Sequence, residues 1–248
     1  ESVTEALKGI LGRRRIPDVV CPRGWGIDPR GVYMVKPGKN GEEPQRIRKA
    51  TEPILLTARL EDLESGKTDL VLEWYVRGPR GGRWHTHVVP RATAASNRGL
   101  VALADYGAPI HDGNARDISR YLMAFEAANV QRLAHAHTAS RMGWQGKNGE
   151  HGFLWGSTLF IGGRAIEAPA DASPAEWPTG FVYFQASEGI EDIARGYRTE
   201  GTWEGWCSAV ELVTDKPKVM LALYLSMVSP LLMLLPELED FSAEWSAP

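Results

Sequence analysis

Apolar and polar residues alternate in short stretches over most of the first hundred residues of this chain. The segment "GWGIDPRGVYMV" alternates on both sides of a "DPRG" turn, which is typical of a β-hairpin. Further strands are predicted at residues 53–63, 69–78 and 83–92, which the polar "ESGKT" turn and the Gly-rich "GPRGG" turn separate. Consecutive strands joined by short turns predict an antiparallel meander in the N-terminal half.

Helical periodicity appears at the start, in the middle and at the end of the chain. Residues 2–13 place Val3, Leu7, Ile10 and Leu11 on one stripe, which predicts a short amphipathic helix. Polar capping residues, glycine and proline mark the ends of the later helices. In chain order, the expected caps and stops are Ser96 or Asn97, Gly107, Asn114, Thr202 and Pro217.

These elements predict an α+β fold, with an antiparallel β-rich N-terminal half and with helices in the middle and at the C-terminus. Residues 1–15 are expected to form an N-terminal helix or arm. Residues 16–236 are expected to form a single α+β domain, with two lobes (16–110 and 111–236) as the alternative. Residues 237–248 are expected to form a tail.

A long apolar segment stands near the C-terminus. Residues 219–235 span 17 positions, whereas a membrane-spanning helix needs about 20. Ser226, Ser229 and Pro230 interrupt the segment, and acidic residues follow it. We therefore expect no membrane span. The segment is instead predicted to be a core helix, kinked or divided at Pro230, that a continuation of the chain covers.

Composition is that of an ordinary globular protein, with 43% hydrophobic and 24% charged residues. Cys21 and Cys207 lie far apart and form no CxxC motif, which favours a reducing compartment and leaves a single long-range disulfide as the alternative. The first residues have acids before bases, the reverse of a signal peptide. We therefore expect a cytoplasmic protein.

Charge is distributed unevenly along the chain. Residues 1–104 carry a formal charge of +6 and residues 105–248 one of −9, which together give the net charge of −3. No acidic residue occurs between Glu73 and Asp105, and arginines and aromatics of this stretch are suited to gripping phosphates and stacking on bases. A solvated basic face and aromatics in a strand core are the alternative interpretation. The candidate DNA-binding residues are Arg77, Arg80, Arg83, Trp84, Arg91 and Arg98.

Two pairs of histidines stand on predicted strands. His85 with His87, and His135 with His137, would each place both imidazoles on one face of a strand, as a strand-borne metal site requires. Nothing in the sequence fixes a third ligand. The competing interpretation is that His85 and His87 form the wet face of an amphipathic strand, and we assign no metal.

Motifs for nucleophilic catalysis, such as GxSxG and SxxK, are absent. Gly66, Lys67 and Thr68 match the last letters of a phosphate-binding loop, but Glu61 stands where the first glycine is needed. We therefore predict a hairpin turn at this point. No catalytic residue, nucleotide site or cofactor is assigned to the chain.

Several short segments, taken in order, resemble the family numbered 927 among domains of unknown function. They are "GVYMV", "LEWYV", "GRWHTHVVPRA", "LVALADYGAPI", "RDISRYLMAF", "RMGWQG", "FLWG", "GTWEGWCSAVE" and "LALYLSMVSPLLMLL". The resemblance covers residues 24–236. Its most recognisable positions, which we interpret as structural, are Gly143, Trp144, Gly201, Trp203 and Trp206.

This family occurs in bacterial, phage and plasmid proteins, including MCM-like helicases of staphylococcal cassette chromosomes and related mobile-element replication proteins. In such proteins the aligned apolar helix leads into a P-loop ATPase core of the AAA+ type. The resemblance therefore implies that residues 237–248 lead to a downstream domain that binds ATP and Mg²⁺. It also implies that this ATPase domain is a partner of the chain and that homo-oligomers form through it.

Three functions are consistent with the sequence. The first is a non-catalytic N-terminal domain of a mobile-element helicase-like ATPase that contacts DNA or organises the ATPase ring. The second is a metal-dependent enzyme built on the histidines. The third is a purely structural interaction domain that contacts its own ATPase core without touching DNA.

Overall fold

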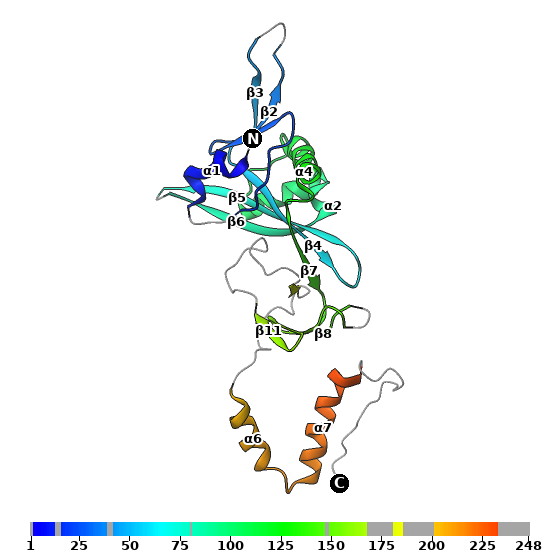
Figure 1. Cartoon of the computed structure of the whole chain (residues 1–248). Helices are drawn as coiled ribbons and strands as arrows, with labels where there is room; N and C mark the ends of the chain where they lie inside the picture. Colours follow the sequence, from blue (N-terminus) through cyan, green and yellow to red (C-terminus); the bar gives the residue numbers. More distant parts are fainter. Residues whose placement is uncertain are drawn as a thin grey trace. The chain divides into compact units, whose positions relative to one another are not determined.

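A computed structural model of the chain shows two compact units, and each is described here by itself. Unit 1 comprises Glu1–Thr138 and Ala168–Phe181, and unit 2 comprises Ala139–Glu167 and Val182–Pro248. Figure 1 labels the elements in chain order. The residues that the structure describes are 2–12, 16–38, 42–79, 81–146, 149–167, 181–185 and 201–232.

The predicted α+β class is confirmed. Antiparallel strands dominate the N-terminal half, and helices lie in the middle and at the C-terminus. The boundary between the units follows Thr138, later in the chain than the lobe boundary predicted after residue 110. Strand β7 (Ala134–Ala139) belongs to unit 1 through Thr138, and it pairs with strand β4 (Ile54–Asp62) of the same unit. The predicted tail, residues 237–248, lies outside the described residues.

The N-terminal helix is α1 (Val3–Leu11), as its apolar stripe predicts. Val3, Leu7 and Leu11 are buried, and Ile10 packs partly against the same core. The Val3 N–H also donates to the Val19 carbonyl over 3.1 Å. The helix is thus held both by its apolar face and by a backbone hydrogen bond to the chain that follows it.

A small antiparallel sheet has the strand order β1-β2-β3. Its strands are β1 (Trp25–Asp28), β2 (Gly31–Lys36) and β3 (Gln45–Ala50). The hairpin predicted at "DPRG" is confirmed, since Asp28 pairs with Gly31. Gly31 has a φ of 134°, and a Cβ at this position would lie 2.0 Å from the Ala50 carbonyl oxygen. Only glycine therefore allows the backbones of β2 and β3 to approach so closely.

The main sheet of unit 1 runs in the order β7-β4-β5-β6. Its strands are β4 (Ile54–Asp62), β5 (Thr68–Gly78), β6 (Gly81–Pro90) and β7 (Ala134–Ala139). β5 pairs antiparallel with β4 and β6, whereas β7 pairs parallel with β4. The Asp62 N–H donates to the Lys67 carbonyl over 2.9 Å, and Gly66 has a φ of 65°. The "ESGKT" segment is therefore the hairpin turn that was predicted, not a phosphate-binding loop.

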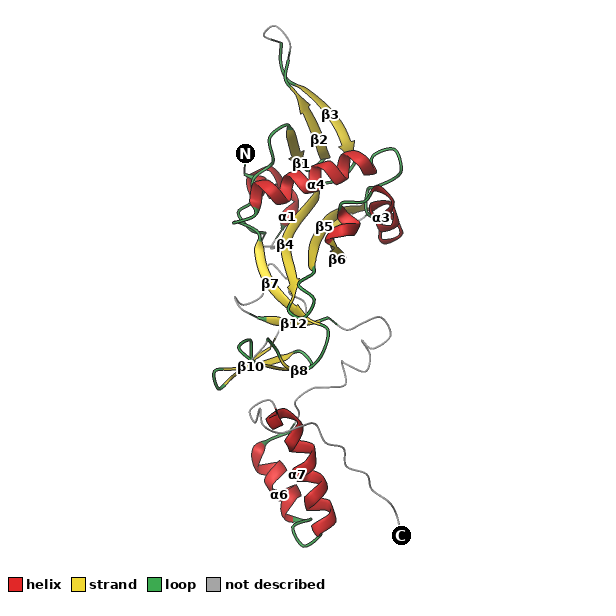
Figure 2. Cartoon of the chain, turned by 90° about the vertical axis from the view of Figure 1, so that its right-hand side faces the viewer, coloured by secondary structure: helices red, strands yellow, loops and turns green. Residues whose placement is uncertain are grey.

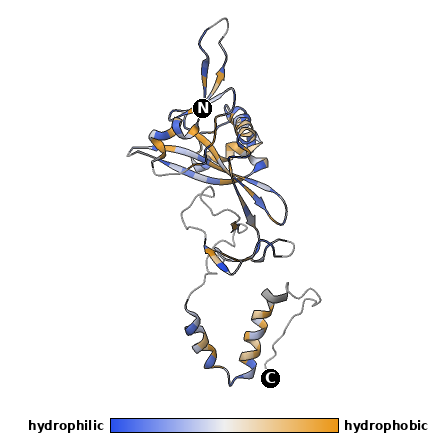
Figure 3. Cartoon of the chain, viewed as in Figure 1, coloured by the Kyte–Doolittle hydropathy of each residue, from blue (hydrophilic) through white to orange (hydrophobic). Residues whose placement is uncertain are grey.

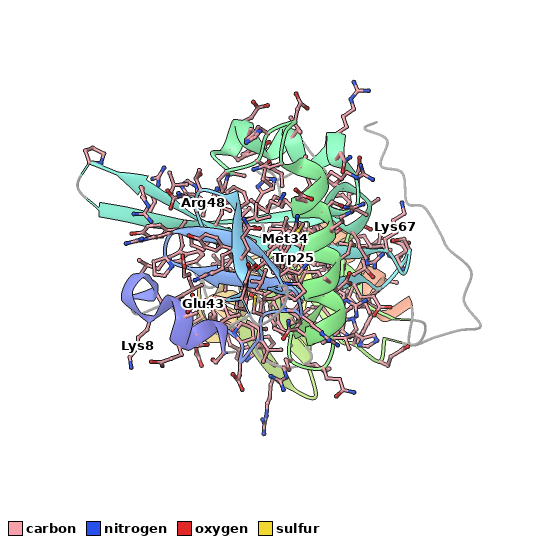
Figure 4. All side chains as sticks on the ribbon, turned by 90° about the horizontal axis from the view of Figure 1, so that it is seen from above. Lys8, Trp25, Met34, Glu43, Arg48 and Lys67 are labelled. Atoms are coloured by element: carbon pink, nitrogen blue, oxygen red, sulfur yellow. The ribbon has the colours of Figure 1, made fainter. Side chains whose placement is uncertain are left out.

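Helices cover one face of this sheet, and Figure 2 shows α4 crossing its strands. They are α2 (Arg91–Ala94), α3 (Asn97–Val101), the 3-10 helix η1 (Ala102–Tyr106) and α4 (Ala115–Asn129). Tyr121 of α4 is fully buried, and its hydroxyl donates to the Ile54 carbonyl over 2.9 Å. Burial raises the pKa of Tyr121 well above its ordinary value, so the hydroxyl keeps its proton. Its ring lies 5.3 Å from that of Trp25, which Figure 4 labels beside α4.

The caps of these helices partly match the prediction. The Ser96 Oγ accepts from the Gly99 N–H over 3.3 Å, and Gly107 ends η1 with a φ of 79°. Asn114 does stand before α4, but the prediction of its side chain as the cap is wrong. Its amide instead bonds three backbone groups of β3 and the preceding loop, because these groups are close enough to compete for it. They are the Lys49 and Pro109 carbonyls, at 2.9 and 3.0 Å, and the His111 N–H, at 2.8 Å.

Unit 2 contains an antiparallel sheet of order β11-β10-β9-β8. Its described elements are β8 (Gly143–Trp144), β9 (Phe153–Trp155), β10 (Thr158–Ile161), β11 (Arg164–Glu167), β12 (Val182–Phe184), α6 (Trp203–Glu211) and α7 (Pro217–Leu232). The Thr202 Oγ1 accepts from the Gly205 N–H over 3.1 Å, which confirms the predicted cap of α6. Pro217 begins α7, also as predicted, and the helix continues through Pro230 to Leu232. Pro230 therefore does not divide the helix.

Helix α7 is hydrophobic along most of its described length (Figure 3). Large apolar side chains on it are nevertheless exposed, with fractions of 51% for Leu221 and 60% for Tyr224. Helix α6 buries none of its side chains. The described part of α7 is thus not enclosed as a core helix would be. Among the described residues, no helix is both long and apolar enough to cross a membrane.

Replacement of Gly31 by alanine tests the close approach of β2 and β3. Gly31→Ala is expected to destabilise unit 1 by about 1–3 kcal/mol more than Gly81→Ala, because only the first substitution drives a Cβ into backbone atoms. Gly81 is a matched control, since its φ of 116° is similar and a Cβ there would meet nothing within 4 Å. Urea denaturation measures both losses. Equal losses would show that backbone conformation alone, not the contact, requires glycine at residue 31.

Candidate nucleic-acid interface

Side chains of β6 alternate between the two faces of the main sheet. Arg83, His85 and His87 pair across from Val76, Trp74 and Leu72 of β5, respectively. Arg83, His85 and His87 belong to the face of the sheet that the helices cover. Trp84, which pairs across from Tyr75, belongs to the opposite face. The arginine-rich stretch is therefore not one surface, and the structure separates Trp84 from Arg83.

An open cavity of about 420 Å³ lies on the helix-covered face at the edge of the sheet. Strands β5 and β6 form one side of it, and the end of η1 forms the other. Its volume is within the usual range of small-ligand sites. We call it the β6 cleft. Its lining residues are Trp74, Val76, Arg83, His85, Thr86, His87, Asp105, Tyr106 and Gly107.

Four aromatic rings succeed one another along the β6 cleft. Trp74 is 1% exposed, and the His85 ring lies parallel to its indole, with centroids 6.3 Å apart and planes 7° apart. The His87 ring lies 6.2 Å from the indole on the same side of the sheet. Tyr106 extends the series, with its ring 4.4 Å from that of His87 and an exposed fraction of 57%. The cleft thus has a rigid inner wall and an exposed aromatic at its outer end.

Arg83 supplies the positive charge of the β6 cleft. Its Nε donates to the His85 Nε2 over 2.8 Å, which makes this imidazole nitrogen the acceptor. Among the described residues Arg83 forms no ion pair, so its charge is free to meet an anion. Burial lowers the pKa of His87 below its ordinary value of 6.5, so this imidazole is neutral at pH 7.

Two of the candidate arginines are already neutralised. The Arg77 Nε lies 2.8 Å from the Glu52 carboxylate, and this hydrogen bond raises the pKa of the guanidinium. The Arg91 Nε lies 3.0 Å from Glu126, a buried carboxylate that also pairs with Arg59 at 3.3 Å. Both arginines therefore have structural partners that a phosphate would have to displace.

The remaining candidates lie in different surroundings. Arg98 is an exposed residue of α3 and has no ion-pair partner within the part of the chain that the structure describes. Arg80 is not among the described residues. The Trp84 Nε1 donates to the Ile10 carbonyl over 3.0 Å, and its ring packs edge-on against Tyr75. Trp84 therefore joins α1 to β6, in agreement with the alternative interpretation of a strand-core aromatic.

The histidine pairs occupy two separate strands. His85 and His87 do share one face, but they line the β6 cleft instead of the wet face that the alternative interpretation expected. His135 lies on β7, where its Nε2 is 3.0 Å from the Val130 carbonyl, and His137 follows two residues later. Within the described ranges, no three His, Cys, Asp or Glu residues gather where they could hold one metal ion. No group of metal ligands is therefore assigned.

The recognisable family positions have structural environments in unit 2. Gly143 has a φ of 103°, and the Trp144 ring packs edge-on against Phe153 at 5.4 Å. Gly201, with a φ of 93°, stands just before the cap of α6. Trp203 and Trp206 stack on each other at 5.0 Å, with planes 20° apart, and Trp203 is 70% exposed. Both tryptophans of this stacked pair are exposed, whereas Gly143 and Trp144 are half-buried.

Sequence reasoning missed the contribution of Trp74, Asp105 and Tyr106 to the β6 cleft. Asp105 and Tyr106 belong to the "LVALADYGAPI" segment, whose pattern predicts only a helix and its stop. The exposed tyrosine next to Gly107 was the available signal. The sequence alone does not show what Tyr106 contacts, because its partner, His87, stands nineteen positions earlier in the chain.

The partly buried environment of His87 predicts a pH dependence of stability. Because its pKa is lowered in the folded chain, the unfolded chain binds more protons as the pH falls below about 6.5. The stability is therefore fully present above this value and decreases as the pH falls toward the folded-state pKa. His87→Gln is expected to flatten this decrease between about pH 7 and pH 5 in urea titrations. An unchanged pH slope in the variant would show that other groups cause the decrease.

Comparison with curated proteins gave no match. A family model does match, and it covers residues 25–241, nearly the range over which the resemblance was found. The match includes every strand and helix described above except α1. This coverage identifies the chain as a member of the family described as Domain of unknown function (DUF927).

Proposed function

We propose that this chain is a non-catalytic, DNA-contacting domain of a mobile-element helicase-like AAA+ ATPase. The β6 cleft carries the DNA part of the proposal, because an arginine with no acidic partner among the described residues stands there beside a series of aromatic rings. The helicase context rests on the resemblance of the sequence segments alone. In this proposal the protein acts in the cytoplasm, and ATP and Mg²⁺ bind a downstream domain.

Single-stranded DNA is the form that suits this arrangement. Proteins that bind single strands combine cations that track the phosphates with aromatic side chains that stack on the bases. Arg83 offers the first and Tyr106 the second, and they line the same cavity. A duplex would keep its bases stacked inside and would leave the exposed ring of Tyr106 without a partner.

The ion pairs decide which arginines serve in this proposal. Arg83 and Arg98 are exposed and have no acidic partner among the described residues, so they can meet phosphates without breaking an ion pair of the described part of the chain. Arg77 and Arg91 would first have to leave Glu52 and Glu126. The proposed phosphate contacts are therefore Arg83 and Arg98.

Alanine substitutions test this assignment. Arg83→Ala and Arg98→Ala are each expected to weaken binding of a single-stranded oligonucleotide and to reduce the slope of log K against log salt by about 0.7, the value for one phosphate contact. Fluorescence anisotropy at several salt concentrations measures both effects. Lys67→Ala is the control, since it removes one charge from the turn at the opposite end of β5. No binding by the wild-type chain, or equal losses in all three variants, would refute the proposed interface.

An interaction domain is the second candidate, and the exposed apolar side chains of unit 2 favour it. Trp203 and Leu212 are 70% and 80% exposed, and Leu221 and Tyr224 on α7 are also exposed. Exposed apolar groups in such number are typical of surfaces that contact another protein. The proposed partner is the ATPase domain of the same protein, which the resemblance implies.

Substitutions on α7 test this second candidate. Leu221→Ser combined with Tyr224→Ser is expected to reduce binding of an apolar dye and concentration-dependent self-association of the chain, because both side chains are exposed apolar groups. Lys218→Ala on the same helix is the control and should change neither. Dye fluorescence and sedimentation velocity provide the measurements. An unchanged dye response in the double variant would exclude α7 as an apolar contact surface.

A further inference from the structure

We infer that the β6 cleft is a subsite for one unpaired nucleobase, stacked on Tyr106 and adjacent to a phosphate held by Arg83. The inference rests on the proposed contact with single-stranded DNA and adds a chemical identity for the group inside the cavity. The argument depends on the shape of the cavity, on its charge and on the exposure of its rings.

The exposed fractions of the aromatic rings indicate which ring a base could stack on. Trp74 is almost fully buried and holds His85 and His87 from behind, so it supports the wall without offering a free face. Tyr106 contacts His87 on one side and leaves more than half of its surface exposed. A flat ring entering the cleft would cover this exposed surface, and base–aromatic stacking contributes about 1–3 kcal/mol for each base.

Charge indicates that the group inside the cavity is neutral. Arg83 and Asp105 both line the cleft, and their formal charges cancel. His87 adds no charge at pH 7, because burial lowers its pKa. A phosphate inside the cavity would meet the Asp105 carboxylate, and a simple cation would meet the guanidinium. A base is neutral and carries both donors and acceptors at its edge, so it can face both side chains.

The hydrogen bond between Arg83 and His85 determines which nitrogens of the guanidinium remain available for a phosphate. The Nε of Arg83 is engaged by the His85 Nε2, which leaves the terminal nitrogens of the guanidinium for another acceptor. Phosphate oxygens match this planar group. Arg83 is exposed and His85 beside it is half-buried, so the proposed phosphate site lies at the solvent-facing edge of the cleft. A nucleotide of a single strand likewise has a charged phosphate next to a neutral base, so it matches the two neighbouring sites of the cleft.

Two oligomers and two variants test the inference. The wild-type chain is expected to bind a mixed-sequence single strand about 5- to 150-fold more tightly than an abasic strand of the same length, which corresponds to stacking of one base. Tyr106→Ala is expected to remove this difference and to leave both the abasic affinity and the salt slope unchanged. Tyr106→Phe keeps the ring and should retain most of the difference. Because Tyr106 is mostly exposed, both variants are expected to melt at nearly the wild-type temperature.

The outcomes distinguish a failure of the base subsite from a failure of the proposed contact with DNA. If the wild-type chain binds neither oligomer, the proposed DNA contact fails. If it binds both equally, the DNA contact stands and the base subsite is wrong. If Tyr106→Ala weakens both oligomers alike while Tyr106→Phe does not, Tyr106 positions Arg83 instead of stacking on a base, and the inference is overturned. The comparison of the two oligomers with the wild-type chain decides the question even where a variant is unstable.

Discussion

Strand β6 pairs with β5 in continuous register from one end to the other, and this pairing determines where every neighbouring functional side chain lies. Successive residues of a strand point to opposite faces, and a slip of one position would exchange the faces. The observed register places Arg83, His85 and His87 on the helix-covered face of the sheet and Trp84 on the opposite face, where its Nε1 donates to the Ile10 carbonyl of α1. The β6 cleft exists because the end of η1 meets this face, with Tyr106 against His87. A slip of one position would exchange the two faces, so Trp84 would lie on the helix-covered face and Arg83 on the opposite one.

Ion pairing has an equally large effect on the interpretation of the basic stretch. The absence of acidic residues between Glu73 and Asp105 suggested a row of available cations. Carboxylates from distant positions nevertheless neutralise part of this row, since Glu52 reaches Arg77 and Glu126 reaches Arg91. In both pairs the carboxylate is largely buried and the arginine is about half exposed, so removal of the arginine would leave a largely buried carboxylate with less compensation. The run of arginines in the sequence therefore predicts a larger basic surface than the structure has. In the structure, only a few exposed arginines of this stretch have no acidic partner among the described residues.

The two units present different kinds of surface. Unit 1 contains a cavity with one cation, one carboxylate and a series of rings, which is suited to a small flat group. The described helices of unit 2 expose apolar side chains, with Trp203 stacked on Trp206 and Tyr224 open on α7. Such surfaces are typical of contact with another protein. The first surface carries the proposed contact with single-stranded DNA, and the second carries the proposed contact with a protein partner.

The sequence by itself determined most local structure: α1, the hairpin at "DPRG", the turn at "ESGKT" and the Thr202 cap all follow from periodicity or turn chemistry within a few residues. It also identified the family, through motifs that remain in order along the chain. Only the tertiary structure decided that Asn114 braces a loop and that Tyr106 completes a cleft with His87. The reason is that these roles depend on contacts between residues far apart in sequence. Alternation predicts that two faces exist, but packing decides what covers each of them.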